Sequence, residues 1–554
     1  MNVGKVKGQT FVFGAIILLI SNVLVKIIGA FFRLPITNII GVEGMAYFNS
    51  AYAIYVVFYN ISTAGIPVAV ARMVAASNER QNHEESHKIF KIALRMFLII
   101  GFVGTAVMMS FSKVFANSAK MPVAYLAMIA IAPTIFFICV SSAYRGYFQG
   151  LSDMVPTGVS QVIESVGKLG IGLAAAIICT GIGMNNESTA AFVISGVSIG
   201  VALSTVYVIA LKYKRRNVLL TKNTELLPVR NTSDILKELI VTAIPITLAS
   251  SIMGLTNIVD TFVLPRQLLT TGITESAATS FYGTYSSMVI PLFNMTPTFI
   301  YPFAISAIPA VSAAIAVGDK DKAFKNIESA FRNCSLIAIP CAIGMGTMSA
   351  RILDMLFSKH ETIETGIDTV TTHGIASPAL SVVSASIFFL GIIAITNSVL
   401  QTWRKERLTI ISTCSGVVVK LVVTWIVSGL PGSGIMGSAV GTAACYFTIM
   451  ALNLFFVIKY TGYVPHIGRI FAKPLVAGIC CGLSAYGTAY ALDMAGLHRH
   501  IVTIVAIGVA VVVYAAVVLL SKGIYREDVM MMPKGAKLAS LMDKFNLLDK
   551  KEMQ

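Results

Sequence analysis

The chain has 554 residues, of which 56% are hydrophobic and 12% are charged, and its mean hydropathy is +0.79. Soluble globular proteins carry about 25% charged residues, so this composition excludes a soluble enzyme, a disordered chain, a secreted disulfide scaffold and a nucleic-acid-binding protein. One helical span needs about 20 apolar residues, and the chain has enough for about fourteen spans. The composition therefore predicts an all-α polytopic membrane protein.

Apolar runs between charged or Gly/Pro-rich loops place the predicted spans along the chain. The first lobe (1–211) holds six, at 10–32, 46–70, 89–111, 121–143, 156–179 and 189–211. A cytoplasmic linker (212–237) leads to the second six-helix lobe (238–458), with spans at 238–263, 281–307, 330–350, 377–400, 408–428 and 434–458. A helix pair (459–522) follows, with spans at 473–492 and 500–521, and then a cytoplasmic tail (523–554).

The distribution of Lys and Arg predicts the orientation. If the N-terminus is cytoplasmic, 32 of the 42 basic residues lie in inner segments. Basic residues concentrate in cytoplasmic loops of membrane proteins, so both termini are expected in the cytoplasm. The net charge of +16 then needs no nucleic acid. The basic run from Lys212 to Arg216 is expected to contact anionic membrane lipids.

Two sequence segments repeat at the same position in both lobes. Gln149, Thr157, Ser160, Lys168 and Leu169 recur 252 residues later as Gln401, Thr409, Ser412, Lys420 and Leu421. The motif Gly65-Ile66-Pro67 in span two matches Ala307-Ile308-Pro309 in span eight. Both matches relate a span to the sixth span after it, so the two lobes cross the membrane in the same direction. This predicts parallel repeats, an architecture typical of transporters.

Ionisable residues inside spans are candidates for function, because they are expensive in a bilayer. Lys26 and Arg33 form a predicted positive stripe on span one, although a lysine reaching the outer headgroups is the alternative. Glu164 and Lys168 in span five have the spacing of an intrahelical ion pair, structural or functional. Lys420, the repeat partner of Lys168, either faces an anionic substrate or bonds to helix carbonyls.

At the outer end of span seven, Asp260 and Arg266 predict a structural salt bridge or, less simply, an ion-coupling site. Five cations against two acids favour an anionic substrate over a cationic drug. Polar and aromatic residues in spans two and eight, including Asn60 and Tyr285, could bind sugar hydroxyls, although tyrosine also marks ordinary membrane interfaces.

No metal site, disulfide or cofactor is predicted. The eight cysteines lie in apolar runs without a ligand spacing. The sequence His83-Glu84-Glu85-Ser86-His87 matches the H-E-x-x-H zinc pattern, but it is expected in a charged cytoplasmic loop without a third ligand. The acidic outer loop from Arg351 to His373 is expected to be a solvated cap.

Two segments carry a family resemblance: NISTAGIPVAVARMVAA (Asn60–Ala76) and YRGYFQGLSDMVPTGVSQVIESVGKL (Tyr144–Leu169). With the fourteen spans, they resemble the stage V sporulation protein B group, which includes the YtgP/MurJ-type lipid II flippases. That group belongs to the multidrug/oligosaccharidyl-lipid/polysaccharide (MOP) exporter superfamily, and the resemblance covers essentially the whole chain.

The resemblance implies a monomeric transporter, not an enzyme, that flips an undecaprenyl-pyrophosphate-linked saccharide by alternating access. Lipid II, the peptidoglycan precursor, is the first candidate for this lipid-linked oligosaccharide. The cavity would be lined by spans one, two, seven and eight, with Lys26 and Arg33 at the family's cationic positions of span one. Span two here has no Arg or Lys, and Tyr285 stands near an arginine position of span eight, which raises the importance of Arg266.

Three alternatives to lipid II flipping remain from the sequence. The first is a flippase for another lipid-linked glycan, and the second is a multidrug or cation antiporter, disfavoured by the sign of the charges within the spans. The third, a membrane glycan polymerase, would need a catalytic cluster in an outer loop.

Overall fold

The computed structural model of the protein describes residues 11–214, 228–521 and Tyr525. Most of the predicted tail (523–554) and part of the predicted linker (212–237) lie outside the described residues. Within the described part, ten helices are long and apolar enough to cross a membrane, or eleven if one bent pair counts as a single span. The protein is therefore an all-α, multi-pass membrane protein.

The chain divides into two compact units, Met1–Arg266 and Gln267–Gln554. The division falls within α10 (Thr232–Thr270), later than the predicted linker. Unit 1 otherwise consists of the following helices: α1 (Phe11–Thr63), α2 (Gly65–Glu79), α3 (His83–Ser110), α4 (Ser112–Ser118), η1 (Pro122–Ala124), α5 (Tyr125–Ile131), α6 (Pro133–Gly150), α7 (Val155–Gly181) and α8 (Asn186–Lys214).

The long helix α1 contains both of the first two predicted spans. Gly41 interrupts it with a positive φ of 75°, a conformation that glycine adopts without steric penalty. The rings of Phe32 and Phe48 are 16 residues apart but only 5.9 Å from each other. A straight helix would separate them by about 24 Å, so the chain folds back at Gly41. The bend converts one continuous helix into two packed segments.

Unit 2 begins with a broken helix in place of predicted span eight. Pro291 and Pro297 stand at the starts of two of its segments, where a proline's missing N–H needs no helical partner. The broken helix comprises α11 (Glu275–Thr284), the π-helical turn η2 (Tyr285–Val289), α12 (Ile290–Met295) and α13 (Pro297–Ala316). The remaining helices are α14 (Lys320–Thr347), α15 (Ser349–Leu356), α16 (Thr372–Thr402), α17 (Glu406–Ser428), α18 (Met436–Thr461), α19 (Ile467–Met494) and α20 (Arg499–Leu520).

A short β-hairpin stands between α15 and α16, where the sequence predicted only a solvated loop. Strand β1 (Thr362–Glu364) pairs antiparallel with β2 (Thr369–Thr371), with Ile363 opposite Val370. Gly366 in the connecting turn has a φ of 88°, which the hairpin requires and glycine supplies.

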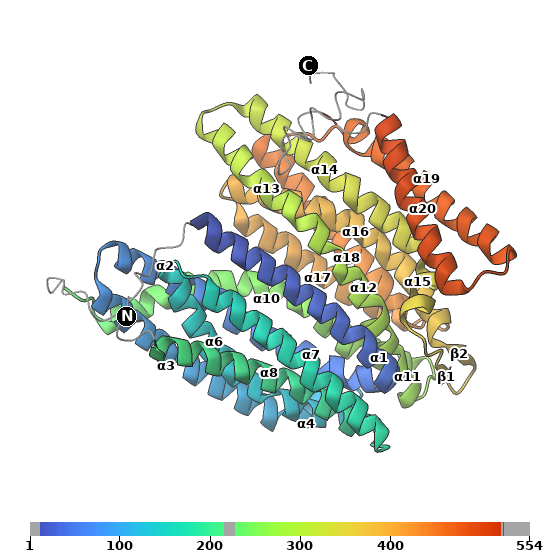
Figure 1. Cartoon of the computed structure of the whole chain (residues 1–554), viewed down its shortest axis with the longest axis horizontal. Helices are drawn as coiled ribbons and strands as arrows, with labels where there is room; N and C mark the ends of the chain where they lie inside the picture. The colour runs from blue at the N-terminus through green and yellow to red at the C-terminus, as the bar shows by residue number, and fades with distance from the viewer. Residues whose placement is uncertain (1–10, 215–227, 522–524, 526–554) are drawn as a thin grey trace, which may run out of the picture. The chain divides into compact units, whose positions relative to one another are not determined.

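The internal repeat is confirmed by the packing inside each unit (Figure 1). In unit 1, α2 packs on α3 and α6, α6 packs on α3 and α8, and α7 packs on α8. In unit 2, α13 packs on α14 and α16, α16 packs on α14 and α18, and α17 packs on α18. The two sets correspond element by element, in the same chain order. Each unit is thus one copy of the same helix arrangement.

The extra pair α19–α20 packs within unit 2 against α14 and α15. A cluster of small and apolar side chains joins these helices, with Cys481, Ala485 and Ala489 of α19 against Val502 and Ala506 of α20. The other faces of α19 and α20 expose large apolar side chains such as Leu483, Ile504 and Val512. Such faces suit the hydrocarbon interior of a bilayer.

Candidate functional site

A row of aromatic rings runs along α1 beyond its bend. Centroid distances are 6.0 Å between Phe48 and Tyr52, 5.6 Å between Tyr52 and Tyr55, and 5.8 Å between Tyr55 and Tyr59. These rings are three or four residues apart, so they lie on one helix face. Phe32 adds its ring from before the bend.

Two cations from different helices meet at Tyr52 in this row. The Arg33 guanidinium lies 5.7 Å from the Tyr52 ring centroid. The Lys168 Nζ, from the middle of α7, lies 4.8 Å from the same centroid and 4.6 Å from that of Phe32. An ammonium or guanidinium at this distance is attracted by the negative face of the ring. We call Phe32, Arg33, Phe48, Tyr52 and Lys168 the cation–aromatic cluster.

Glu164, one helical turn before Lys168, forms its ion pair with Arg145 of α6. Arg145 Nη2 lies 3.0 Å from Glu164 Oε2, and Arg145 Nε donates to Ser160 Oγ at 2.9 Å. The Arg145 side chain is only 6% exposed and that of Glu164 20%. The sequence predicted Lys168 as the partner of Glu164, and the structure adds Arg145 of α6 as an ion-pair partner of this acid. Arg145 therefore offsets the charge of the acid, and Lys168 lies against the faces of Phe32 and Tyr52 within reach of the same carboxylate's field.

The other predicted residues of unit 1 are spread over several environments. Lys26 is exposed on α1, so Lys26 and Arg33 do not share one environment. Asn60 lies where α1 approaches α10, with its Nδ2 2.9 Å from the position that a Cβ at Gly254 would occupy. Asp260 is buried, whereas Arg266 is exposed at the end of the unit. The salt bridge between Asp260 and Arg266 therefore stays a prediction from the sequence.

In unit 2, Lys420 is buried at 2% exposure on α17, and its repeat neighbour is Gly416 rather than an acid. A Cβ at Gly416 would lie 2.4 Å from Ile449 Cγ1 and 2.9 Å from the Cys445 carbonyl oxygen of α18. Helix packing therefore explains why no counterpart of Glu164 stands there. Tyr285 is also fully buried. Its hydroxyl lies 3.0 Å from the Ser438 carbonyl oxygen and 2.8 Å from Thr442 Oγ1, which places it in the packing of α18.

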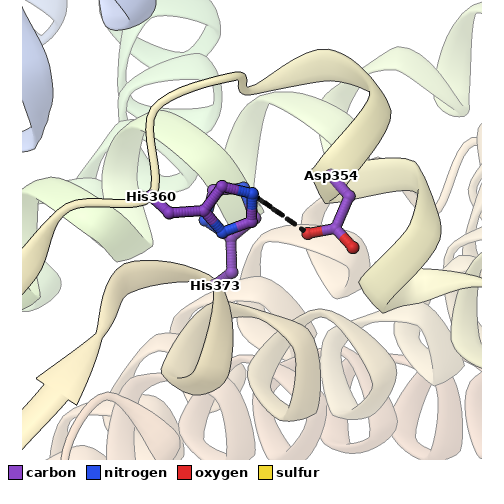
Figure 2. A group of neighbouring side chains, drawn as sticks. All are labelled: Asp354, His360 and His373. Atoms are coloured by element: carbon purple, nitrogen blue, oxygen red, sulfur yellow. Dashed lines mark ion pairs between the residues drawn. The ribbon is translucent and has the colours of Figure 1, made fainter. Parts of the chain in front are cut away.

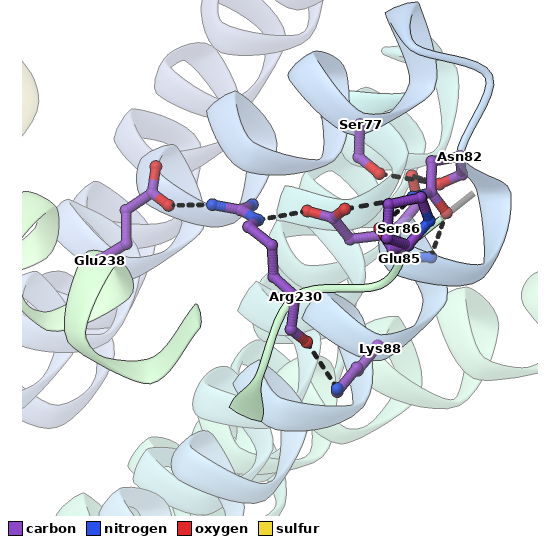
Figure 3. Close-up of polar contacts among 8 residues, drawn as sticks. Ser77, Asn82, Glu85, Ser86, Lys88, Arg230 and Glu238 are labelled. Atoms are coloured by element: carbon purple, nitrogen blue, oxygen red, sulfur yellow. Dashed lines mark hydrogen bonds and ion pairs between the residues drawn. The ribbon is translucent and has the colours of Figure 1, made fainter. Parts of the chain in front are cut away.

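The H-E-x-x-H segment is the first turn of α3, not a loop as predicted. Asn82 caps this helix by accepting from the Glu85 backbone N–H. The buried Glu85 carboxylate pairs with Arg230, which precedes α10 (Figure 3). Arg230 Nε lies 2.5 Å from Glu85 Oε1, and its Nη1 lies 2.6 Å from Glu238 Oε2. Partial burial lowers the pKa of Arg230, but hydrogen bonds to both carboxylates outweigh it and hold that pKa above its ordinary value.

Three charged side chains are buried that the sequence did not predict to be buried: Arg145, Arg332 and Glu328. Arg145 is one of the 32 basic residues counted in the inner segments, and the structure shows it buried within α6. Arg332 and Glu328 form a buried pair one turn apart on α14. The sequence feature that could have indicated burial of Arg145 is the run of small residues Ser141-Ser142-Ala143 shortly before it.

Comparisons with known proteins agree with this architecture. The profile of a family described as polysaccharide biosynthesis protein matches residues 11–314. Stage V sporulation protein B of Bacillus subtilis (strain 168) is 23% identical over 88% of this chain and 92% of its own. The lipid II flippase MurJ of the same organism is 22% identical over 81% of this chain and 83% of its own.

Two solved structures share the fold. The inward closed conformation of lipid II flippase MurJ covers 91% of this chain and 98% of its own, with a TM-score of 0.66 and 14% identity. The match to an inward-facing multidrug resistance MATE family transporter of the MOP superfamily covers 80% of this chain and 94% of the transporter, with a TM-score of 0.60 and 16% identity. The predicted resemblance to the stage V sporulation protein B and MurJ group is confirmed.

Proposed function

Because this chain belongs to the polysaccharide biosynthesis protein family, we propose that it is a flippase for an undecaprenyl-pyrophosphate-linked saccharide. Lipid II is the first candidate substrate, since a lipid II flippase is among the relatives that match most of the chain. The direction is from the inner to the outer leaflet of a bacterial cell membrane. The protein acts as a monomer with both termini in the cytoplasm, and no catalytic step is required.

The observation that carries the proposal is the balance of charge around Tyr52. The charge of Glu164 is offset by Arg145, while Arg33 and Lys168 contribute two positive charges against the aromatic faces. Cations in an apolar setting attract an anion strongly, because the effective dielectric there is low. A pyrophosphate offers the charge, and the tyrosine hydroxyls offer hydrogen bonds to a saccharide.

The repeated units supply a route for the movement. In alternating access, two similar lobes rock about a central site and expose it to each side of the membrane in turn. We infer that Arg33 and Lys168 bind the pyrophosphate, with Lys26, Arg266 and Lys420 as further cations along its route, while the polyprenyl chain stays in lipid. An anion that moves outward across an inside-negative membrane gains about 2.3 kcal/mol per charge per 100 mV. The membrane potential can therefore drive flipping without a separate coupling ion.

The direct test is complementation of a bacterial strain depleted of its own lipid II flippase. We expect the wild-type chain to restore growth and wall synthesis. Equal amounts of protein in the membrane without rescue would argue against lipid II as the substrate. Rescue of a strain lacking a flippase for capsule or teichoic precursors would instead assign another lipid-linked glycan.

A further inference from the structure

Three side chains that can ligate a metal ion meet between α15 and α16 (Figure 2). Asp354 lies on α15, His360 lies in the segment before β1, and His373 lies in the first turn of α16. Nε2 of His360 is 3.8 Å from Asp354 Oδ1, and Nε2 of His373 is 3.9 Å from the same oxygen. The potential ligand atoms of all three residues lie within 4.8 Å of one another.

These separations fit a bridging ion better than direct hydrogen bonds. A hydrogen bond between imidazole nitrogen and carboxylate oxygen spans about 2.7–3.2 Å, so Asp354 does not bond either ring directly. In a tetrahedral zinc site with bonds of about 2.0–2.1 Å, neighbouring ligand atoms lie about 3.3 Å apart. Around an ion, the two separations from Asp354 Oδ1 would shorten by about 0.5 Å, and the widest separation in the group, at most 4.8 Å, would shorten by up to about 1.5 Å.

The two histidines differ in how firmly they are held. The His373 side chain is 8% exposed, with its Nε2 2.9 Å from the Phe357 carbonyl oxygen and its Nδ1 3.3 Å from Thr372 Oγ1. His360 is half-exposed and stacks on His373 with 3.9 Å between ring centroids. His373 is thus the fixed ligand, and His360 turns out of the stack to direct its lone pair at the ion.

Coordination also leaves the proton of His373 with a partner. When Nε2 binds a metal, the neutral ring carries its proton on Nδ1, which then donates to Thr372 Oγ1. A metal-ligating histidine usually donates its other ring N–H in this way. The Phe357 carbonyl, released by Nε2, can accept a hydrogen bond from a metal-bound water.

The local charge and the donor atoms define the class of ion. Between residues 351 and 373 there are four acids against Arg351 and Lys359, and Arg351 already pairs with Asp493. Two imidazole nitrogens and one carboxylate suit zinc and neighbouring transition metals. Calcium and magnesium prefer oxygen ligands throughout.

We propose that Asp354, His360 and His373 bind one Zn²⁺ ion, with water in the remaining position. The ion clips α15 and the segment before the hairpin to the first turn of α16. In the predicted orientation the site faces the outer side of the membrane, where external zinc reaches it directly. The site is separate from the proposed flipping of lipids and does not depend on it.

The test uses the full-length protein, purified in detergent and stripped of metal with a chelator. Calorimetric titration with zinc chloride should show one saturable site, and Co²⁺ should give the absorption of a four-coordinate complex. His360→Ala should weaken zinc binding by more than about 100-fold, because even outer-shell partners contribute about 10- to 100-fold. The double variant His498→Ala/His500→Ala, which removes the exposed histidine pair at the start of α20, should bind zinc as the wild type does.

His360 is half-exposed, so its variant is expected to fold, and Asp354→Asn gives a second test that preserves shape. Wild-type protein without a saturable zinc site would overturn the proposal. The same holds if His360→Ala and Asp354→Asn bind zinc with unchanged affinity. Neither result bears on lipid flipping, because the titration contains no transport step.

Discussion

At Tyr52, the positive charges of Arg33 and Lys168 converge on one aromatic ring. The ring faces attract both charges and offset part of the repulsion between them. Lys168 stands midway along α7, where a lysine cannot easily reach either membrane surface. We propose that a lysine at this depth binds the anionic cargo during transport.

Replacing Lys168 by glutamine should slow lipid II flipping by about tenfold or more, because a hydrogen-bonded contact to a charged group contributes about 1.5–3 kcal/mol. The measurement is the initial rate of labelled lipid II translocation in proteoliposomes. Lys113→Gln is the matched control, since Lys113 also lies over a ring, 5.5 Å from the Tyr125 centroid, but on the exposed helix α4. Equal rates in both variants would remove Lys168 from the site.

The ionisable residues could be found in the sequence, but their partners could not. Glu164 and Lys168 are four residues apart on one helix, and local spacing alone makes them a pair. Arg145 reaches Glu164 because α6 and α7 pack together, and a 19-residue separation in sequence carries no such information. Tyr285 was predicted at the substrate site from its position in a span, yet the packing of α18 decides its burial.

Between helices, close packing depends on glycines in both units. Gly167 of α7 faces Gly200 of α8, where an added Cβ would lie 2.8 Å from the Gly200 Cα. In unit 2, Gly416 of α17 faces Ile449 and the Cys445 carbonyl of α18, and Gly441 of α18 faces Thr424 of α17. Small residues let helix backbones approach closely in a membrane, where dispersion contacts replace the hydrophobic effect. The close approach of these two helix pairs therefore has the same physical basis in both units.

Gly416→Ala should lower the unfolding temperature, because the new methyl group meets Ile449 and the Cys445 carbonyl at less than contact distance. Overpacking of this kind destabilises by about 1–3 kcal/mol. Gly170→Ala on α7 is the control: no atom lies within 4 Å of its added Cβ, and alanine favours a helix by about 1 kcal/mol. The measurement is thermal unfolding of both variants and the wild type in the same detergent. An unchanged unfolding temperature for Gly416→Ala would contradict the close packing of α17 on α18.

Arg230 anchors the start of α10 to α3 in unit 1. Its guanidinium joins the buried Glu85 to Glu238, and Lys88 Nζ donates to the Arg230 carbonyl oxygen at 2.6 Å. Arg230→Gln leaves the Glu85 carboxylate buried without its cation. Amide exchange at 83–90 should become at least about fivefold faster, equivalent to about 1 kcal/mol.

Hydrogen–deuterium exchange with peptide resolution makes that comparison. Arg80→Gln, an exposed arginine at the end of α2, is the matched control and should leave exchange at 83–90 unchanged. If both variants exchange alike, the Arg230–Glu85 pair does not hold the two helices together.

The positions of helices could be predicted from apolar runs, because a bilayer imposes span length directly on composition. The predicted spans fall largely on helices among the described residues, although spans one and two share α1 and span eight is divided among four segments. The bends and turns that connect the helices could not be predicted from the apolar runs. The bend at Gly41 and the hairpin around Gly366 depend on single positive-φ glycines in otherwise ordinary segments.

For the whole molecule, the two units repeat one helix arrangement, and the family profile covers the first unit and continues into the second. A repeated helix arrangement of this kind is typical of transporters. We propose that the cargo is an anionic lipid-linked saccharide. The negative charge of this cargo distinguishes the proposed flippase from an antiporter for cationic drugs or cations.

The most direct measurement is translocation of labelled lipid II in proteoliposomes under an imposed membrane potential of either sign. We expect protein-dependent movement of lipid II toward the positive side, faster by up to about 50-fold per charge at 100 mV if the full potential acts on the rate. The double variant Arg33→Gln/Lys168→Gln should abolish this movement. An anionic cargo would be contradicted if lipid II and other undecaprenyl-pyrophosphate saccharides are not translocated while a cationic compound is transported across the membrane.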